Sequence, residues 1–271
     1  MATKIMVWPK YLSTTTYIVI SIVGLFAFLL PFLQPQIQFT ESGIGHTQDA
    51  PIFTLTLVFL CLMAMLLDAQ SNMLNAKTVA LLGVLLSINT VIRFVEVAIP
   101  GPGGVTPVFF LIMVAGFVFG PRFGMLMGCL SLLTSAFVTG GVGPWLPFQM
   151  FTAGWMGLSA GLLGRAVRRL ENKRLQLVAL VVFAALWGFL YGAIMNVWFW
   201  PFADNPIQQS WRPGMSLGEV IDHYLLFYSL TSLTWDAFGA AGNGALMVAF
   251  GGAAIGVLDR AHKRFEFAIL S

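Results

Sequence analysis

Apolar and polar positions follow one another along the chain in long blocks, and the apolar blocks are joined by short connections rich in glycine, proline or basic residues. About 20 apolar residues of helix cross the hydrocarbon core of a bilayer, and backbone groups in lipid must bond within their own segment. The blocks therefore predict an all-α membrane protein of about eight spans. The predicted spans are residues 14–33, 52–67, 78–98, 106–119, 123–139, 145–163, 175–200 and 225–257.

Two of these blocks do not have the length of a single perpendicular span. Residues 106–119 form only about 21 Å of helix, less than the roughly 30 Å of the hydrocarbon core, so this span needs the support of the loop before it. The block of residues 225–257 is too long for a single perpendicular span. We expect an interfacial or tilted helical part before Trp235 and the span itself after it.

Two loops rich in glycine and proline lie before the predicted span 106–119 and after the predicted span 123–139. Their sequences are PGPGG at 100–104 and GGVGPW at 140–145. Such sequences break helices and let the backbone come close to a ligand. The eight-span count puts both loops on the same side of the membrane, which predicts the rim of a cavity. Each loop taken alone is explained equally well as a tight turn.

Basic residues predict the orientation, because short loops rich in Lys and Arg stay in the cytoplasm. With the N-terminus inside, twelve of the fourteen Lys and Arg residues are cytoplasmic, and Arg93 and Arg212 fall toward the outside. Both termini are then cytoplasmic, and the loops at 99–105, 140–146 and 201–223 face outward. This topology explains the basic cluster at 165–174, and a docking patch for lipid or protein is the alternative.

The composition limits the class of protein. Of 271 residues, 58% are hydrophobic and 9% are charged, against about 25% charged in soluble proteins. The spans leave no room for a separate soluble domain. The net charge of +3 is explained by orientation and gives no reason to expect a nucleic-acid partner. Cys61 and Cys129 lie in separate apolar runs without metal-ligand spacing.

Motifs of catalysis and nucleotide binding are absent from the sequence. It contains no GxxxxGK[ST] loop, no HExxH and no GxSxG, and its three histidines are scattered. We therefore predict that the chain is not an enzyme, holds no metal or catalytic cofactor, and does not hydrolyse nucleotides by itself.

A small set of polar residues lies at membrane depth. Arg93 and Glu96 are spaced i, i+3, so they share a helix face and are expected to pair, either beside a cavity or at the interface. Asn196, Asp236 and Asn243 lie in the last two spans. Contact with a ligand and hydrogen bonds between helices both explain the asparagines.

Tryptophans are crowded on the predicted outer side. Five of the eight, Trp145, Trp198, Trp200, Trp211 and Trp235, lie at or near its rim. An interfacial belt explains any one of them, but the crowding favours aromatic walls around a large flat ligand. We predict a substrate-binding set of Arg93, Glu96, Gly103, Gly104, Trp145, Gln149, Asn196, Trp200, Trp211, Tyr228, Trp235 and Asp236.

The third span carries small residues at a spacing of four, Ala76 and Ala80 followed by Gly83 and Ser87. This spacing lets another helix approach closely. The other helix belongs either to a partner protein or to the same bundle.

These features resemble the substrate-binding S components of energy-coupling factor (ECF) vitamin transporters. The resemblance covers residues 76–264. It rests on the small-residue helix, on PGPGGVTP after Arg93, on the short span that follows, on GPRFG at 120–124, and on GGVGPWLPFQMFTAGWMGLSAGLLGR at 140–165.

The resemblance implies a six-helix core, residues 76–271, in the plasma membrane of a prokaryote. Such a core captures a micronutrient from outside and docks, through Ala76, Ala80, Gly83 and Ser87, on a membrane scaffold (T component) that binds two ATPases. Within the family the chain is most similar to proposed cobalamin carriers, which implies cobalamin as the ligand. The chain departs from the family by its two extra spans in residues 1–75.

Two other classes stay open at this point. A self-contained secondary transporter or channel would need ionisable groups along a pathway, and the spans contain almost none. A structural or assembly protein of the membrane would not need a pocket with aromatic and polar walls.

Overall fold

The computed structural model describes residues 8–33, 50–70, 76–98, 105–203 and 206–266, and every regular element in these ranges is a helix. The predicted all-α class is confirmed. The elements are α1 (Trp8–Leu33), α2 (Ala50–Gln70), α3 (Ala76–Ala98), α4 (Val108–Phe119), α5 (Pro121–Thr139), α6 (Leu146–Val167), α7 (Lys173–Phe199), the short 3-10 helices η1 (Trp200–Phe202) and η2 (Ile207–Gln209), α8 (Leu217–Thr231) and α9 (Leu233–Glu266).

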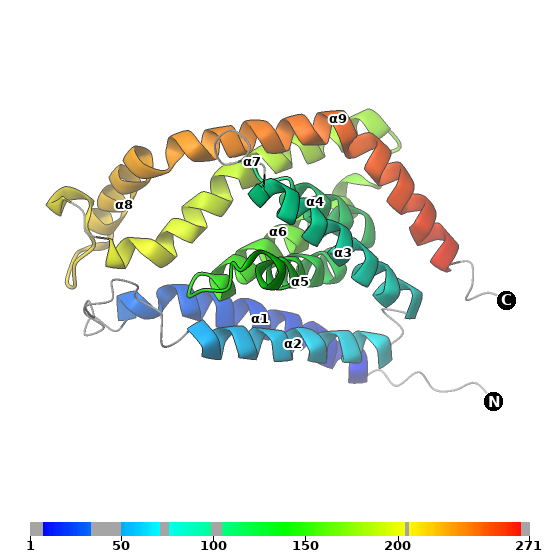
Figure 1. Ribbon diagram of the computed structural model, residues 1–271, viewed down its shortest axis with the longest axis horizontal. Coiled ribbons are helices and arrows are strands. Elements are labelled where there is room, and N and C mark those ends of the chain that lie inside the picture. Colours follow the sequence, from blue (N-terminus) through cyan, green and yellow to red (C-terminus); the bar gives the residue numbers. More distant parts are fainter. Residues whose placement is uncertain (1–7, 34–49, 71–75, 99–104, 204–205, 267–271) are drawn as a thin grey trace.

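The helices form a bundle with α4, α5 and α6 at its centre (Figure 1). α1 and α2 run side by side along one edge, and α7 and α9 run side by side along the opposite edge. The start of α1 and the end of α9 lie at the same end of the bundle, which we call the terminal end. α8 lies at the opposite end, which we call the distal end.

Six helices are long and apolar enough to cross a membrane: α1, α2, α3, α5, α7 and α9. The count of eight spans is not confirmed. α4 has only 12 residues, and α6 has 22 but is made less apolar by Gln149 and a series of glycines. Both of these helices are central, where they pack against other helices of the bundle.

The short helix α4 is enclosed by the bundle. Ten of its twelve residues are buried, and it packs against α5, α6, α9 and α3. We predicted that the preceding loop supports this span, but residues 99–104 lie outside the described ranges. The observed support comes from the neighbouring helices, so α4 does not have to match the thickness of a bilayer by itself.

The long last block is divided as predicted. α8 ends at Thr231, and α9 begins at Leu233, two residues before Trp235. α8 starts at a capping box, in which the Ser216 hydroxyl accepts from the Glu219 amide and the Glu219 carboxylate accepts from the Ser216 amide. Hydrogen bonds that the Ser216 hydroxyl and the Ser216 amide donate to the Glu219 carboxylate lower the pKa of Glu219.

Glycines let the three central helices touch through their backbones. Gly116 of α4 and Gly124 of α5 both lie against Gly157 of α6, where an added Cβ would overlap a facing carbonyl oxygen. One turn further, Gly128 lies against the carbonyl of Ala153. Small residues at such contacts allow an approach that larger side chains would prevent. The mutual packing of α4, α5 and α6 therefore depends on these glycines.

The first prediction tests this close approach. Gly157→Ala should lower the free energy of unfolding by about 1–3 kcal/mol, because overpacking a tight contact forces the backbones apart. The matched control is Gly83→Ala, where an added Cβ meets no atom within 4 Å. The control should change stability by less than about 1 kcal/mol. Thermal unfolding in detergent measures both, and equal unfolding temperatures would show that the helices do not depend on this contact.

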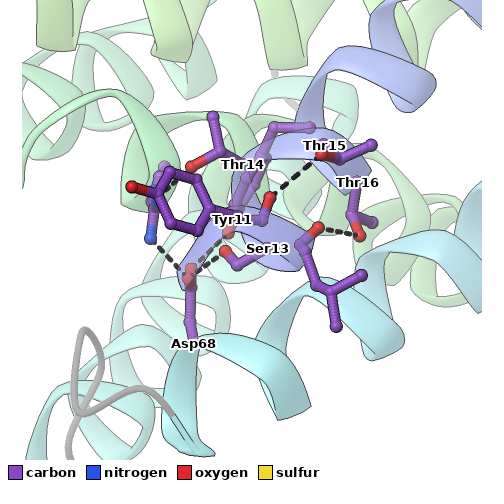
Figure 2. A network of polar contacts seen from close by, with 9 residues as sticks. Tyr11, Ser13, Thr14, Thr15, Thr16 and Asp68 are labelled. Atoms are coloured by element: carbon purple, nitrogen blue, oxygen red, sulfur yellow. Dashed lines mark hydrogen bonds and ion pairs between the residues drawn. The ribbon is translucent and has the colours of Figure 1, made fainter. Parts of the chain in front are cut away.

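A buried carboxylate joins the two N-terminal helices to the core (Figure 2). Asp68, near the end of α2, is fully buried and accepts hydrogen bonds from Ser13 and Tyr17 of α1. Its Oδ1 also pairs with Nη1 of Arg122 in α5 at 2.8 Å, and Nη2 of Arg122 donates to Thr14 at 2.6 Å. The sequence analysis did not single out Asp68. This network connects α1, α2 and the first turn of α5.

The second prediction concerns this network. Asp68→Asn should lower the free energy of unfolding by about 3 kcal/mol, because it leaves a largely buried guanidinium without its carboxylate. Asp68→Asn combined with Arg122→Gln should cost less than the sum of the two single changes. Thr15→Ala is the control, since Thr15 donates to the Tyr11 carbonyl of its own helix. An Asp68→Asn variant as stable as Thr15→Ala would contradict the prediction.

Candidate functional site

An aromatic cavity of about 420 Å³ lies at the distal end, between α1, α7 and α8. Trp200 is 2% exposed, and its indole Nε1 donates to the Gln209 carbonyl at 2.6 Å. The rings of Trp200 and Tyr224 pack edge to face with their centroids 5.1 Å apart. Those of Trp211 and Phe32 do so with their centroids 5.3 Å apart. The cavity is lined by Leu29, Phe32, Val197, Trp200, Trp211, Val220, Ile221, Tyr224 and Leu225.

Two walls of this cavity were missed by the sequence analysis. α8 contributes Tyr224, whose hydroxyl donates to the Ala193 carbonyl of α7. α1 contributes Leu29 and Phe32, so a helix that we assigned to the N-terminal extension forms part of the wall. The available signal for α8 was the helical spacing of apolar residues in 217–231, such as Leu217, Val220, Ile221, Tyr224 and Leu225. Nothing in the sequence indicated that Phe32 would reach Trp200 and Trp211.

The polar residues predicted in the last two spans contact neighbouring segments, and Asn243 of α9 donates to the Ala184 carbonyl of α7 at 3.5 Å. Asn196 donates to the Ser232 hydroxyl at 2.6 Å, and Tyr228 donates to Asp236 at 2.9 Å. The Asp236 carboxylate lies directly over Gly192 of α7. These contacts agree with the alternative in which helix-to-helix bonds satisfy such groups. None of Asn196, Tyr228 and Asp236 lines the aromatic cavity.

The predicted pair of Arg93 and Glu96 is confirmed, with Nη1 and Oε1 2.5 Å apart. Both side chains are largely buried near the distal end of α3. Glu96 Oε2 has no hydrogen-bond partner within the described ranges. The pair lies near Tyr191 of α7, whose ring packs on Phe109 at 4.4 Å. This polar pair is separate from the aromatic cavity, and its contact with a ligand stays a prediction.

The other predicted site residues are dispersed. Trp145 folds over its own loop, where its indole donates to the Gly141 carbonyl at 3.0 Å and its ring covers Gly143. Gln149 is half-buried one turn later. Trp235 is 59% exposed on α9 and does not line the cavity. Of the twelve predicted residues, Trp200 and Trp211 are therefore the two that share the aromatic cavity. Gly103 and Gly104 lie outside the described ranges.

The small residues of α3 form an exposed face. Ala76, Ala80, Gly83 and Ser87 are all exposed, and the buried residues of α3 are Leu82, Leu85 and Asn89. The opposite face bonds to α5 through Asn89, which donates to Ser131 at 2.9 Å. Packing of the four small residues inside the bundle is therefore not what the structure shows. The face is open to a helix from elsewhere.

A comparison with known families decides which of the predicted classes applies. Residues 77–250, well over half of the chain, match the family described as ECF transporter, substrate-specific component. The chain belongs to this family. No curated protein and no solved structure matches it.

As an ECF substrate-specific component, the chain is a membrane subunit that determines what a transporter carries. The family match begins at α3, so α1 and α2 precede the matched region. In this S component the two preceding helices nevertheless pack against α5 and α6, and α1 lines the cavity. Among the described residues, no group of three potential metal ligands comes together.

Proposed function

We propose that this S component captures a vitamin-type micronutrient, with cobalamin as the leading candidate, in the aromatic cavity at the distal end. It then delivers the ligand through an ATP-driven complex with a T component and two ATPases. The observation that carries the proposal is the cavity between α1, α7 and α8. A concave, mostly apolar site of 300–1,000 Å³ with a few polar groups is typical of small-molecule binding.

The cavity favours a ligand with a flat face. Trp200 and Trp211 supply rigid aromatic surface, and aromatic rings contribute large contact area with little loss of side-chain entropy. Tyr224 is held by its bond to the Ala193 carbonyl, so this wall is already organised before a ligand arrives. The cavity volume of about 420 Å³ would hold one portion of a ligand as large as cobalamin. The rest of such a ligand would lie toward the loops at the distal end.

The proposed orientation places the cavity outside the cell. The chain crosses from the terminal to the distal end along α1, and the basic cluster at 165–174 lies between α6 and α7 at the terminal end. The positive-inside tendency supports a cytoplasmic terminal end. The distal cavity would then meet ligand from outside, and the terminal half of α3 would lie near ATPases in the cytoplasm.

The third prediction tests the cavity with matched tryptophans. Trp211→Ala should weaken binding of the preferred vitamin about tenfold, since truncating an aromatic contact typically costs ~1–3 kcal/mol. Trp235→Ala is the control, because Trp235 is exposed outside the cavity. Binding of cobalamin, riboflavin, thiamin, biotin and folate is measured by titration in detergent. Equal binding by both variants would remove the cavity as the site, and tight binding of another vitamin would replace cobalamin.

The fourth prediction tests docking through α3. Gly83→Leu should abolish transport and co-purification of the T component and ATPases, while the Kd for the vitamin stays within about threefold. Gly244→Leu is the control, because an added Cβ at either glycine meets no atom within 4 Å. Unfolding temperatures verify that both variants fold. Recovery of partners with Gly83→Leu would show that they dock on another surface, whereas parallel loss of folding and vitamin binding would assign the face to the bundle.

A further inference from the structure

A second cavity lies on the surface of the bundle, between α1 and the central helices α5 and α6. Its volume is about 660 Å³. It runs along the middle of α1, from Thr14 to Leu25, and shares no lining residue with the aromatic cavity, to which α1 contributes Leu29 and Phe32. The lining residues are Thr14, Tyr17, Ile18, Ser21, Ile22, Leu25, Pro121, Arg122, Leu158, Leu162 and Arg165. We call this cavity the α1 groove.

The long wall of the α1 groove is apolar and open to the surroundings of the bundle. Ile18, Ile22 and Leu25 follow one another along α1 and are each more than half exposed. Leu162 of α6 faces them across the groove and is 50% exposed. From Thr14 to Leu25 the helix rises about 16 Å, close to half of the roughly 30 Å hydrocarbon core. The groove therefore has the length of one lipid leaflet.

The terminal end of the groove is basic. Arg165, at the end of α6, is exposed and makes no ion pair among the described residues. Arg122 is held by Asp68 and Thr14, which use two of the five donors of its guanidinium. Because Asp68 offsets the charge of Arg122, the uncompensated charge at this end comes from Arg165. The Thr14 and Ser21 hydroxyls add polar groups along the α1 wall.

We propose that the α1 groove binds one anionic phospholipid. The phosphate lies at Arg165 and the remaining donors of Arg122, and an acyl chain lies along Ile18, Ile22 and Leu25. Arginine guanidinium groups match phosphate oxygens in geometry and charge. Basic pockets between transmembrane helices on the cytoplasmic side are suited to anionic lipid head groups. Such a lipid contacts α1, α5 and α6 at once.

The dimensions favour a lipid over a helix of another protein. A helix with its side chains is about 10–12 Å across, so a length of about 16 Å would occupy roughly twice the volume of the groove. A chain of methylene groups is narrower. The basic end also favours a ligand that has a negatively charged head and an apolar tail. A hydrophobic helix has no such charged head.

The fifth prediction is tested on the full chain, purified in an uncharged detergent. Phosphatidylglycerol or phosphatidylcholine with identical acyl chains is added in mixed micelles, and unfolding temperature and native mass spectra are recorded. Phosphatidylglycerol should raise the unfolding temperature and be retained at one molecule per chain, because a ligand that binds the folded state stabilises it. Phosphatidylcholine should do so at least tenfold less effectively by concentration.

Three variants identify the groove as the site. Arg165→Gln should weaken retention of phosphatidylglycerol about tenfold, by loss of a charged hydrogen-bonding partner. Arg174→Gln removes the same charge from an exposed position outside the groove and should leave retention unchanged. Ile22→Trp should fill the groove and displace the lipid. Unfolding temperatures without lipid verify that all three variants fold.

The outcomes separate the lipid from other occupants. Equal stabilisation by both phospholipids, or equal retention by Arg165→Gln and Arg174→Gln, would overturn the proposal. Glycerol phosphate without acyl chains should have no effect, and stabilisation by it would reassign the basic end to a soluble phosphate ligand. Loss of phosphatidylglycerol from both Arg165→Gln and Ile22→Trp, but not from Arg174→Gln, supports the lipid.

Discussion

The contact of α4, α5 and α6 through their glycines is the constraint on which the rest of the structure depends. Where Gly116, Gly124 and Gly157 meet, backbone lies directly on backbone, and a methyl group would overlap a carbonyl oxygen. Such contacts fix the separation and rotation of helices more narrowly than contacts between flexible side chains. Because α4 is held in this way on several sides, it can be shorter than a bilayer is thick.

The outer helices α3 and α1 pack on this central core with one side and have other residues that are exposed or line the aromatic cavity. α3 bonds to α5 through Asn89 and Ser131 on one face and exposes small residues on the other. α1 bonds to α2 and α5 at the terminal end through Asp68 and lines the aromatic cavity at the distal end. The N-terminal extension is therefore joined to the family core at both ends, by polar contacts at one end and by aromatic contacts at the other.

The sequence predicted what depends on local pattern. Helix class, most helix boundaries and the break before Trp235 follow from apolar blocks, and Arg93 with Glu96 follows from helical spacing. Contacts between distant segments could not be read in this way. Nothing local distinguishes Asp68, which is bonded to residues 55 and 54 positions away in the chain. For the same reason Trp235 was grouped with Trp200 and Trp211, although it does not line their cavity.

The geometry of α3 relates the two ends of the molecule. Gly83 and Arg93 lie about 15 Å apart along one continuous helix. Between them, Asn89 and Thr90 bond to Ser131 and Thr134 of α5, so the middle of α3 is fixed to the core. A partner helix packed against the exposed small residues would therefore contact α3 on the N-terminal side of this fixed region. The proposed capture of a ligand at the distal end and the proposed docking at the terminal half of α3 would then be physically separable, because the fixed middle of α3 lies between the two positions.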